Sequence, residues 1–173
     1  IARLSIEGAL AASHRHVFAV LLWFVLLPGP CGALLYRLSL IVRERWGRAL
    51  VEADKGFATF AIQSFSIIDW LPVRVTASAF AVVGDFEDAA YCWRTQAAQW
   101  PDRDLGIVLA AGAGALGVQL GRPVVEGVEI SDRAELGLGD PADVDFMQSA
   151  VGLVWRATVV WLLLLFLRSE EHT

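Results

Sequence analysis

Positive charge is scarce in this sequence, and no stretch of it forms a basic block. The chain of 173 residues carries 14 Lys and Arg against 19 Asp and Glu, which gives a net charge of −5. Proteins that bind nucleic acids gain much of their affinity by neutralising phosphates with clustered Lys and Arg. The composition therefore predicts no nucleic-acid partner.

Cysteine is scarce too, and the two that occur, Cys31 and Cys92, are far apart in the sequence. Both have apolar or aromatic neighbours, which favours packed free thiols over a disulfide or a pair of metal ligands. His14 and His16 are two positions apart, so on a helix they point to different faces. We therefore expect a polar cluster at the membrane interface there rather than a shared metal, and we predict no metal site.

The chain has an excess of apolar residues. Hydrophobic residues make up 56% of the sequence, which includes seven Trp, and the mean hydropathy is +0.54. A soluble domain is about 45–50% apolar. The excess predicts an all-α integral membrane helical bundle whose main partner is the lipid bilayer. Polar and Pro/Gly interruptions indicate broken or short helices, in roughly three or four membrane-associated segments.

Both ends of the sequence suggest a piece of a longer protein. The first residue is Ile1, and no basic-then-apolar signal peptide precedes the first apolar segment. Residues 168–173 read like the translation of a common sequencing adapter. We expect a single membrane domain over residues 1–167, the C-terminal part of a longer protein, followed by an adapter-derived tail over residues 168–173.

The N-terminal part predicts a helix and then a broken membrane segment. Residues 1–13 place apolar side chains at helical spacing. Residues 17–42 are apolar around a Pro/Gly element, which we interpret as a break inside one membrane-embedded region. Tyr36 and Arg37 would anchor its far end at the interface. The positive-inside rule places the next connection in the cytoplasm, because it holds the most basic residues of the chain, Arg43, Arg45, Arg48 and Lys55.

The segment 68–74 places ionisable residues between apolar runs, where they are costly and usually have a role or a partner. Residues 57–68 predict one helix. Asp69 is then expected to cap a new helix that has Pro72 in its first turn and ends at Gly84. We predict that Asp69 and Arg74 couple, directly or through the backbone cap, and organise the bundle.

Residues 85–100 mix aromatic and charged side chains, which is typical of an interfacial helix. Glu87 and Asp88 are a possible catalytic carboxylate pair. Adjacent residues diverge on a helix, however, which favours the start of a solvated helix instead.

Residues 105–120 are rich in Gly and Ala and contain G-x-G-x-x-G at Gly112, Gly114 and Gly117. A dinucleotide site would need a strand before this motif, a helix after it and an acid about 20 residues further on. No repeating β-α pattern surrounds it. Ala113, Gly117 and Gly121 recur at every fourth position, which predicts a small-residue face for helix packing that also includes Gly114. On this interpretation Gly117→Leu would disrupt helix packing.

The C-terminal part is a polar loop followed by an apolar helix. Residues 122–145 are acidic but lack the spacing of a calcium loop, so we expect a solvated loop outside the membrane. Residues 151–167 predict a membrane helix. Its one cation, Arg156, would snorkel to the interface or pair within the bundle.

Three blocks of the sequence, in this order, resemble blocks of the CobD/CbiB superfamily. They are LPGPCGALLYR at 27–37, DWLPVRVT at 69–76 and AGALGVQLG at 113–121. Their order and spacing make the resemblance specific, and they cover nearly the whole chain as the C-terminal part of such a protein. The polar-core positions carried over are Pro30, Gly32, Tyr36, Arg37, Asp69, Pro72, Arg74 and Thr76.

The resemblance implies a multi-pass protein of the bacterial inner membrane with one of two functions. Members of the superfamily include the membrane-bound adenosylcobinamide-phosphate synthase, which joins an aminopropanol-type amine to a corrin carboxylate with ATP. The related AmpE proteins lack that assigned chemistry and are linked to signalling, and DW-x-PVR at 69–74 is closer to them. The synthases also carry polar blocks where this chain has AASHRH at 11–16 and LSLIV at 38–42.

A ligase that uses ATP needs carboxylates and polar groups to hold Mg²⁺ and polyphosphate. This chain lacks most of those polar positions. We therefore rank a non-catalytic, AmpE-like sensor or interaction protein as the first hypothesis. It would need no cofactor, and its partners would be other membrane or signalling proteins. The alternative is the amide ligase, with ATP, Mg²⁺ and a corrinoid substrate. A transport or scaffold subunit is the third hypothesis.

Overall fold

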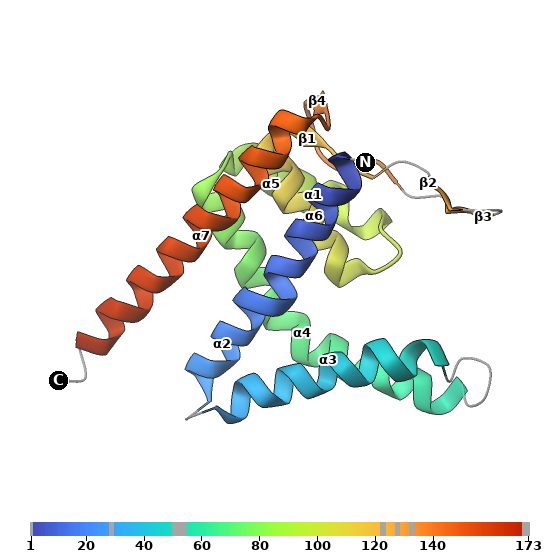
Figure 1. Cartoon of the computed structure of the whole chain (residues 1–173), viewed down its shortest axis with the longest axis vertical. Helices are drawn as coiled ribbons and strands as arrows, with labels where there is room; N and C mark the ends of the chain where they lie inside the picture. Colours follow the sequence, from blue (N-terminus) through green and yellow to red (C-terminus); the bar gives the residue numbers. More distant parts are fainter. Residues whose placement is uncertain are drawn as a thin grey trace.

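The protein is helical almost throughout, as the computed structural model shows for residues 2–27, 30–49, 55–121, 124–126, 129–131 and 134–170 (Figure 1). Three of its described helices are long and apolar enough to cross a membrane, Ala2–Leu26, Gly56–Val83 and Val144–Leu167. An all-α membrane bundle is therefore confirmed.

The first membrane helix is continuous. It consists of α1 (Ala2–Ser13), a π-helical segment η1 (His14–Phe18) and α2 (Ala19–Leu26). On its inner face Leu10 packs against Gly112, and the Glu7 carboxylate accepts a hydrogen bond from the Gly121 backbone N–H at 2.9 Å. The two segments that the sequence suggested are thus a single span.

A single broken membrane segment over residues 17–42 was a wrong prediction. Leu27 is extended, with φ −104° and ψ 139°, and the chain reverses there before α3 (Cys31–Ala49) begins. Residues 28 and 29 lie outside the described part. A Cβ on Gly32 would be 2.0 Å from the Trp23 carbonyl oxygen, so the close approach of α3 to α2 requires glycine. α3 is not among the helices apolar enough to span, because it carries Arg37, Arg43 and further charges.

The predicted helix start at Asp69 was also wrong. One helix, α4 (Lys55–Val83), runs through this region with Pro72 inside it. A proline within a helix leaves the carbonyl four residues earlier without its usual donor. That carbonyl belongs to Ile68, and it accepts a hydrogen bond from the Trp23 indole at 3.3 Å. A tertiary contact from α2 therefore lets α4 continue past Pro72. Its end before Gly84 was predicted correctly.

Two short helices complete the packed region. In α5 (Phe86–Thr95) the Asp85 side chain caps the N-terminus by accepting from the Asp88 N–H at 3.1 Å, which confirms a helix start at these acids. The 3₁₀ turn η2 (Ala97–Gln99) leads to α6 (Arg103–Leu116), which Asp102 caps. α6 is buried along most of its length, and Figure 1 shows it surrounded by α1, α4 and α5.

The small residues at the end of α6 pack in a different way from the prediction. Ala113 is buried on the helix, and Gly114 lies against the backbone of α5. Gly117 and Gly121 are not on a helical face at all. Gly117 ends α6 with φ +65°, and Gly121 has φ +81° in the segment that follows. No strand precedes the glycine motif in the described chain, so the dinucleotide alternative has no structural support.

We expect substitution of Gly117 to act through the backbone. A Cβ there would have nothing within 4 Å, but the left-handed conformation costs an L-residue about 1–2 kcal/mol. Gly117→Ala and Gly117→Leu should therefore lower the free energy of unfolding in mixed micelles by similar amounts, and Gly117→Asn by less. A much larger loss for leucine than for alanine would support the helix-packing interpretation instead.

The segment after α6 packs on the core through two leucines. β1 (Val118–Gln119) pairs in parallel with β4 (Asp140–Pro141), and Leu120 bridges to Leu136, both fully buried. β2 (Val124–Glu126) and β3 (Glu129–Ser131) form an antiparallel pair. The acidic loop over residues 122–145 was expected to be solvated surface, but Leu136 within it is buried.

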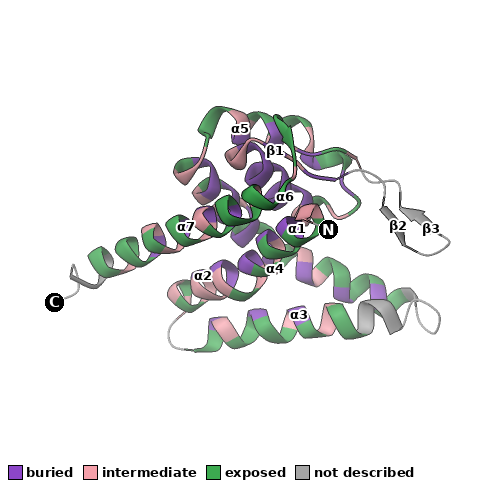
Figure 2. Ribbon diagram, turned by 45° about the horizontal axis from the view of Figure 1, so that its top comes forward, coloured by how far each residue is buried: buried purple, intermediate pink, exposed green. Residues whose placement is uncertain are grey.

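The last helix, α7 (Val144–Glu170), starts earlier than predicted. It packs on α1 and α4 near its start and then runs outward, with apolar side chains exposed along it (Figures 1 and 2). Arg156 is exposed on this helix and donates to the Gly152 carbonyl of its own helix at 3.3 Å. α3 and the first half of α4 also expose large apolar residues, among them Leu38, Phe60 and Ile67, which is the expected surface for contact with lipid.

Both cysteines are free. Cys92 is buried on α5, and burial raises the pKa of its thiol, as expected of a packed and unreactive group. Cys31 is exposed at the start of α3, so the prediction of a packed thiol holds only for Cys92.

Candidate functional site

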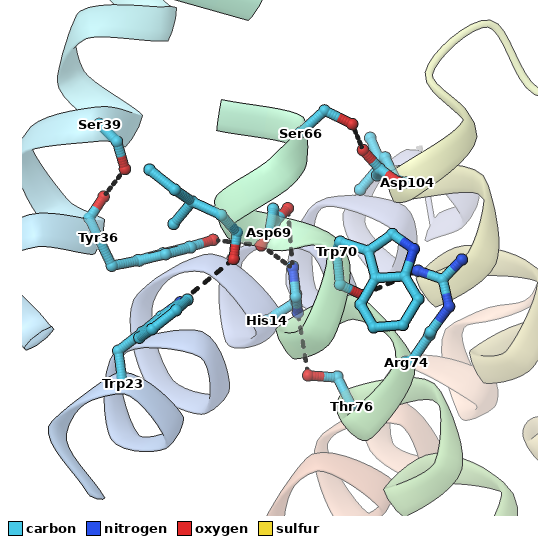
Figure 3. A network of polar contacts seen from close by, with 12 residues as sticks. His14, Trp23, Tyr36, Ser39, Ser66, Asp69, Trp70, Arg74, Thr76 and Asp104 are labelled. Carbon is cyan, nitrogen blue, oxygen red and sulfur yellow. Dashed lines mark hydrogen bonds and ion pairs between the residues drawn. The ribbon is translucent and has the colours of Figure 1, made fainter. Parts of the chain in front are cut away.

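A buried cluster of four polar side chains joins three helical segments (Figure 3). His14 Nε2 lies 3.1 Å from Asp69 Oδ1, and the Tyr36 hydroxyl donates to the same oxygen at 2.9 Å. His14 Nδ1 is 3.0 Å from the Thr76 hydroxyl. All four residues are at most 3% exposed.

Each member of this polar cluster comes from a different turn or helix. Asp69 and Thr76 are seven residues apart on α4, which places them on one face of that helix. Tyr36 reaches the carboxylate from α3, and His14 reaches it from the π-helical segment. An Asp carboxylate in an apolar interior is stable only when it is paired and hydrogen-bonded. The phenol and the imidazole meet that requirement at Asp69.

The predicted coupling of Asp69 with Arg74 was wrong. Five residues along an α-helix correspond to a rotation of about 140° from the starting face, so the two side chains leave α4 on different sides (Figure 3). Arg74 Nη1 donates to the Trp70 carbonyl at 2.8 Å, and its guanidinium carbon lies 4.0 Å from the centroid of the Trp70 ring.

The other residues carried over from the three sequence blocks lie apart from one another and have separate contacts. Pro30 precedes α3, and its carbonyl accepts from the Leu34 N–H at 3.0 Å. Arg37 contacts the His16 ring on the exposed side of α3, so His14 and His16 have separate partners. Pro72 is buried inside α4. Tyr36, Asp69 and Thr76 alone meet in the polar cluster.

None of the four residues of the polar cluster lines a described pocket. Their hydrogen bonds connect the first membrane helix, α3 and α4. In the described part of the chain no group of three or more His, Cys, Asp or Glu side chains is arranged to hold a metal ion.

A neighbouring face of α4 lines a pocket of about 490 Å³, which we call the arginine pocket. Its walls come from α3, α4 and the segment that leads into α6. The lining residues are Arg43, Ile62, Phe65, Ser66, Trp70, Arg74, Pro101, Asp102, Arg103 and Asp104.

Both acids of the arginine pocket are engaged. Asp102 pairs with Arg43, whose guanidinium also lies over the Phe65 ring at 4.8 Å from its centroid. Burial alone would raise the pKa of Asp102, but the charge of Arg43 and the hydrogen bonds it receives lower that pKa below its usual range. Asp104 accepts a hydrogen bond from the Ser66 hydroxyl at 2.5 Å. These contacts tie the start of α6 to α3 and α4.

The fold and these contacts define the class of protein as a multi-helix integral membrane protein with the buried polar cluster and the arginine pocket. The chain belongs to the CobD/CbiB protein family, whose model matches residues 1–154. The superfamily resemblance of the three sequence blocks is thereby confirmed.

Two curated relatives cover nearly all of this chain. The chain is 38% identical over 165 residues to "Cobalamin biosynthesis protein CobD" of Stutzerimonas stutzeri, a match that spans 95% of this chain and 54% of the relative. It is 37% identical over 161 residues to the protein of the same name from Chromobacterium violaceum, over 93% of this chain and 51% of the relative. The chain thus spans about half the length of these relatives. No solved structure matches it significantly.

Sequence reasoning missed His14, Trp23 and Asp102. Asp69 could have pointed to His14, because a carboxylate between apolar runs needs a polar partner. Pro72 could have pointed to a donor such as Trp23, because a proline inside a helix leaves one carbonyl without its hydrogen-bond donor. Asp102 precedes Leu105 at cap spacing, but its pairing with Arg43 spans 59 positions and has no local signature.

Proposed function

We propose that this chain is a membrane-embedded part of an inner-membrane protein of cobalamin biosynthesis. The observation that carries the proposal is the identity of 37–38% with two curated relatives named for that pathway, over more than nine-tenths of this chain. Neither relative is named for signalling. This evidence reverses the order of the first two hypotheses and places the biosynthetic protein ahead of the AmpE-like sensor.

The reaction that the resemblance implies is amide formation between a corrinoid carboxylate and an amino alcohol, with ATP as co-substrate and Mg²⁺ as cofactor. The residues of this chain would contribute binding and support rather than a metal site. The polar cluster fixes α4 against α3 and the first membrane helix, and α4 presents Trp70 and Arg74 to the arginine pocket.

The test is complementation with the full-length gene. A strain that lacks the synthase is grown on medium where growth requires cobalamin made from cobyric acid. We expect the full-length gene to restore growth, and the empty vector serves as the control. Absence of growth, with the protein detected in the membrane by immunoblot, would contradict the proposal and favour the non-catalytic alternative.

A further inference from the structure

The arginine pocket has more positive charge than its acids can neutralise. Three guanidinium groups line it, and two carboxylates. Asp102 is paired with Arg43, and Asp104 is bound by Ser66. Among the described residues Arg74 and Arg103 have no carboxylate contact. Arg74 lies within the candidate membrane span Gly56–Val83, where an arginine is costly unless it reaches a counter-charge or water, so this cation favours an anionic ligand.

Arg74 is held in a geometry suited to an oxyanion. Its guanidinium stacks on the Trp70 ring at 4.0 Å and uses one N–H for the Trp70 carbonyl. Guanidinium carries five N–H donors in a planar fork, which matches the spacing of phosphate oxygens. Stacking restricts the rotation of this fork before any ligand binds, which lowers the entropy cost of binding.

The pocket is also half apolar. Ile62, Phe65 and Trp70 form its wall on α4, and they lie within the candidate membrane span Gly56–Val83. Exposed Ile67 and Leu71 continue the apolar surface of the same helix beside the pocket. A ligand at this position can thus combine a phosphate group with an apolar portion.

We propose that the arginine pocket binds the phosphate group of an anionic molecule, with Arg74 and Arg103 as its direct contacts and Arg43 kept in place by Asp102. The phosphate can belong to a lipid headgroup or to a soluble compound, because the recognition chemistry is the same. This inference extends the proposed function, which already assigns Trp70 and Arg74 to this pocket. Binding is measured without any reaction, so it can fail while complementation succeeds, and the reverse.

The experiment uses purified full-length protein in neutral detergent at constant ionic strength. One arm titrates inorganic pyrophosphate against chloride, and the other titrates dioleoylphosphatidylglycerol against dioleoylphosphatidylcholine. The readout is the ligand-dependent rise of the unfolding temperature, from which the apparent affinity is derived. The variants are Arg74→Gln and Arg103→Gln. Arg156→Gln is the matched control, because Arg156 also bonds the carbonyl four residues before it on a span but lines no described pocket.

We expect at least one anionic probe to stabilise the wild-type protein, with affinity reduced about tenfold or more in Arg74→Gln. Arg156→Gln should bind as wild type does. A response to phosphatidylglycerol alone identifies a lipid headgroup, and a response to pyrophosphate alone identifies a soluble phosphate compound. Arg103 is exposed, so its variant reports on binding even if Arg74→Gln fails to fold. Unchanged affinity in a folded pocket variant, an equal loss in Arg156→Gln, or no response to either probe would overturn the proposal.

Discussion

Gly114→Ala is expected to lower the free energy of unfolding by about 3 kcal/mol, the upper end of the cost of overpacking. A Cβ at Gly114 would lie 2.5 Å from the Asp88 carbonyl oxygen and 2.7 Å from the Ala89 Cα. These are backbone atoms of α5, so no side-chain rotation relieves the clash, and α5 and α6 must separate. The measurement is unfolding in mixed micelles, followed by circular dichroism.

Gly8→Ala is the matched control for this prediction. Gly8 is also helical, but a Cβ there would have nothing within 4 Å. Alanine is favoured over glycine in a helix by roughly 0.5–1 kcal/mol, so this variant should be as stable as the wild type or slightly more so. Equal losses at the two positions would show that helical glycine in general, rather than the contact of α5 with α6, determines stability.

Asp69→Ala should cost about 2–6 kcal/mol, at about 1–3 kcal/mol for each of two buried groups left without a hydrogen-bond partner. The substitution leaves the Tyr36 hydroxyl and His14 Nε2 without their acceptor in a region that is at most 3% exposed. Removing one donor is a smaller change, so Tyr36→Phe should cost about 1–2 kcal/mol. The measurement is again the free energy of unfolding in mixed micelles.

A double-mutant cycle separates the polar cluster from a general effect of removing acids. Asp69→Ala and His14→Ala should be strongly non-additive, because each removes the partner of the other. Asp145→Ala is the control, since Asp145 is exposed in the first turn of α7. Its loss should be within about 0.5 kcal/mol of zero. Additive losses at Asp69 and His14 would mean that their contact contributes little to the fold.

The sequence predicted what depends on local rules. Apolar excess predicted the membrane class, Gly84 predicted the end of α4, and the acids at 87–88 predicted a helix start. Local rules misplaced the start of a helix at Asp69, because Pro72 usually marks a first turn. The Trp23 indole reverses that preference by bonding the Ile68 carbonyl, and 45 positions separate those two residues.

The site was less predictable than the fold for the same reason. Tyr36, Asp69 and Thr76 were identified through their sequence blocks, but no periodicity shows that they meet at His14. The arginine pocket combines α3, α4 and the start of α6, so its cations lie up to 60 positions apart in the sequence. Contacts of this kind are set by tertiary packing, which local propensity does not encode.

The π-helical segment η1 lets α1 and α2 make contacts that would face different directions on a regular helix. In η1 the Ala19 N–H bonds the His14 carbonyl, five residues back, so one turn holds an extra residue. Each residue of an α-helix advances the direction of its side chains by about 100°. A regular helix through 14–18 would therefore turn α1 by that angle relative to α2. Either Glu7 and His14, which both lie before the extra residue, would lose the Gly121 N–H and Asp69, or Trp23 on α2 would lose the Ile68 carbonyl. The extra residue thus sets the rotation between α1 and α2, so that both sets of contacts form on one continuous helix.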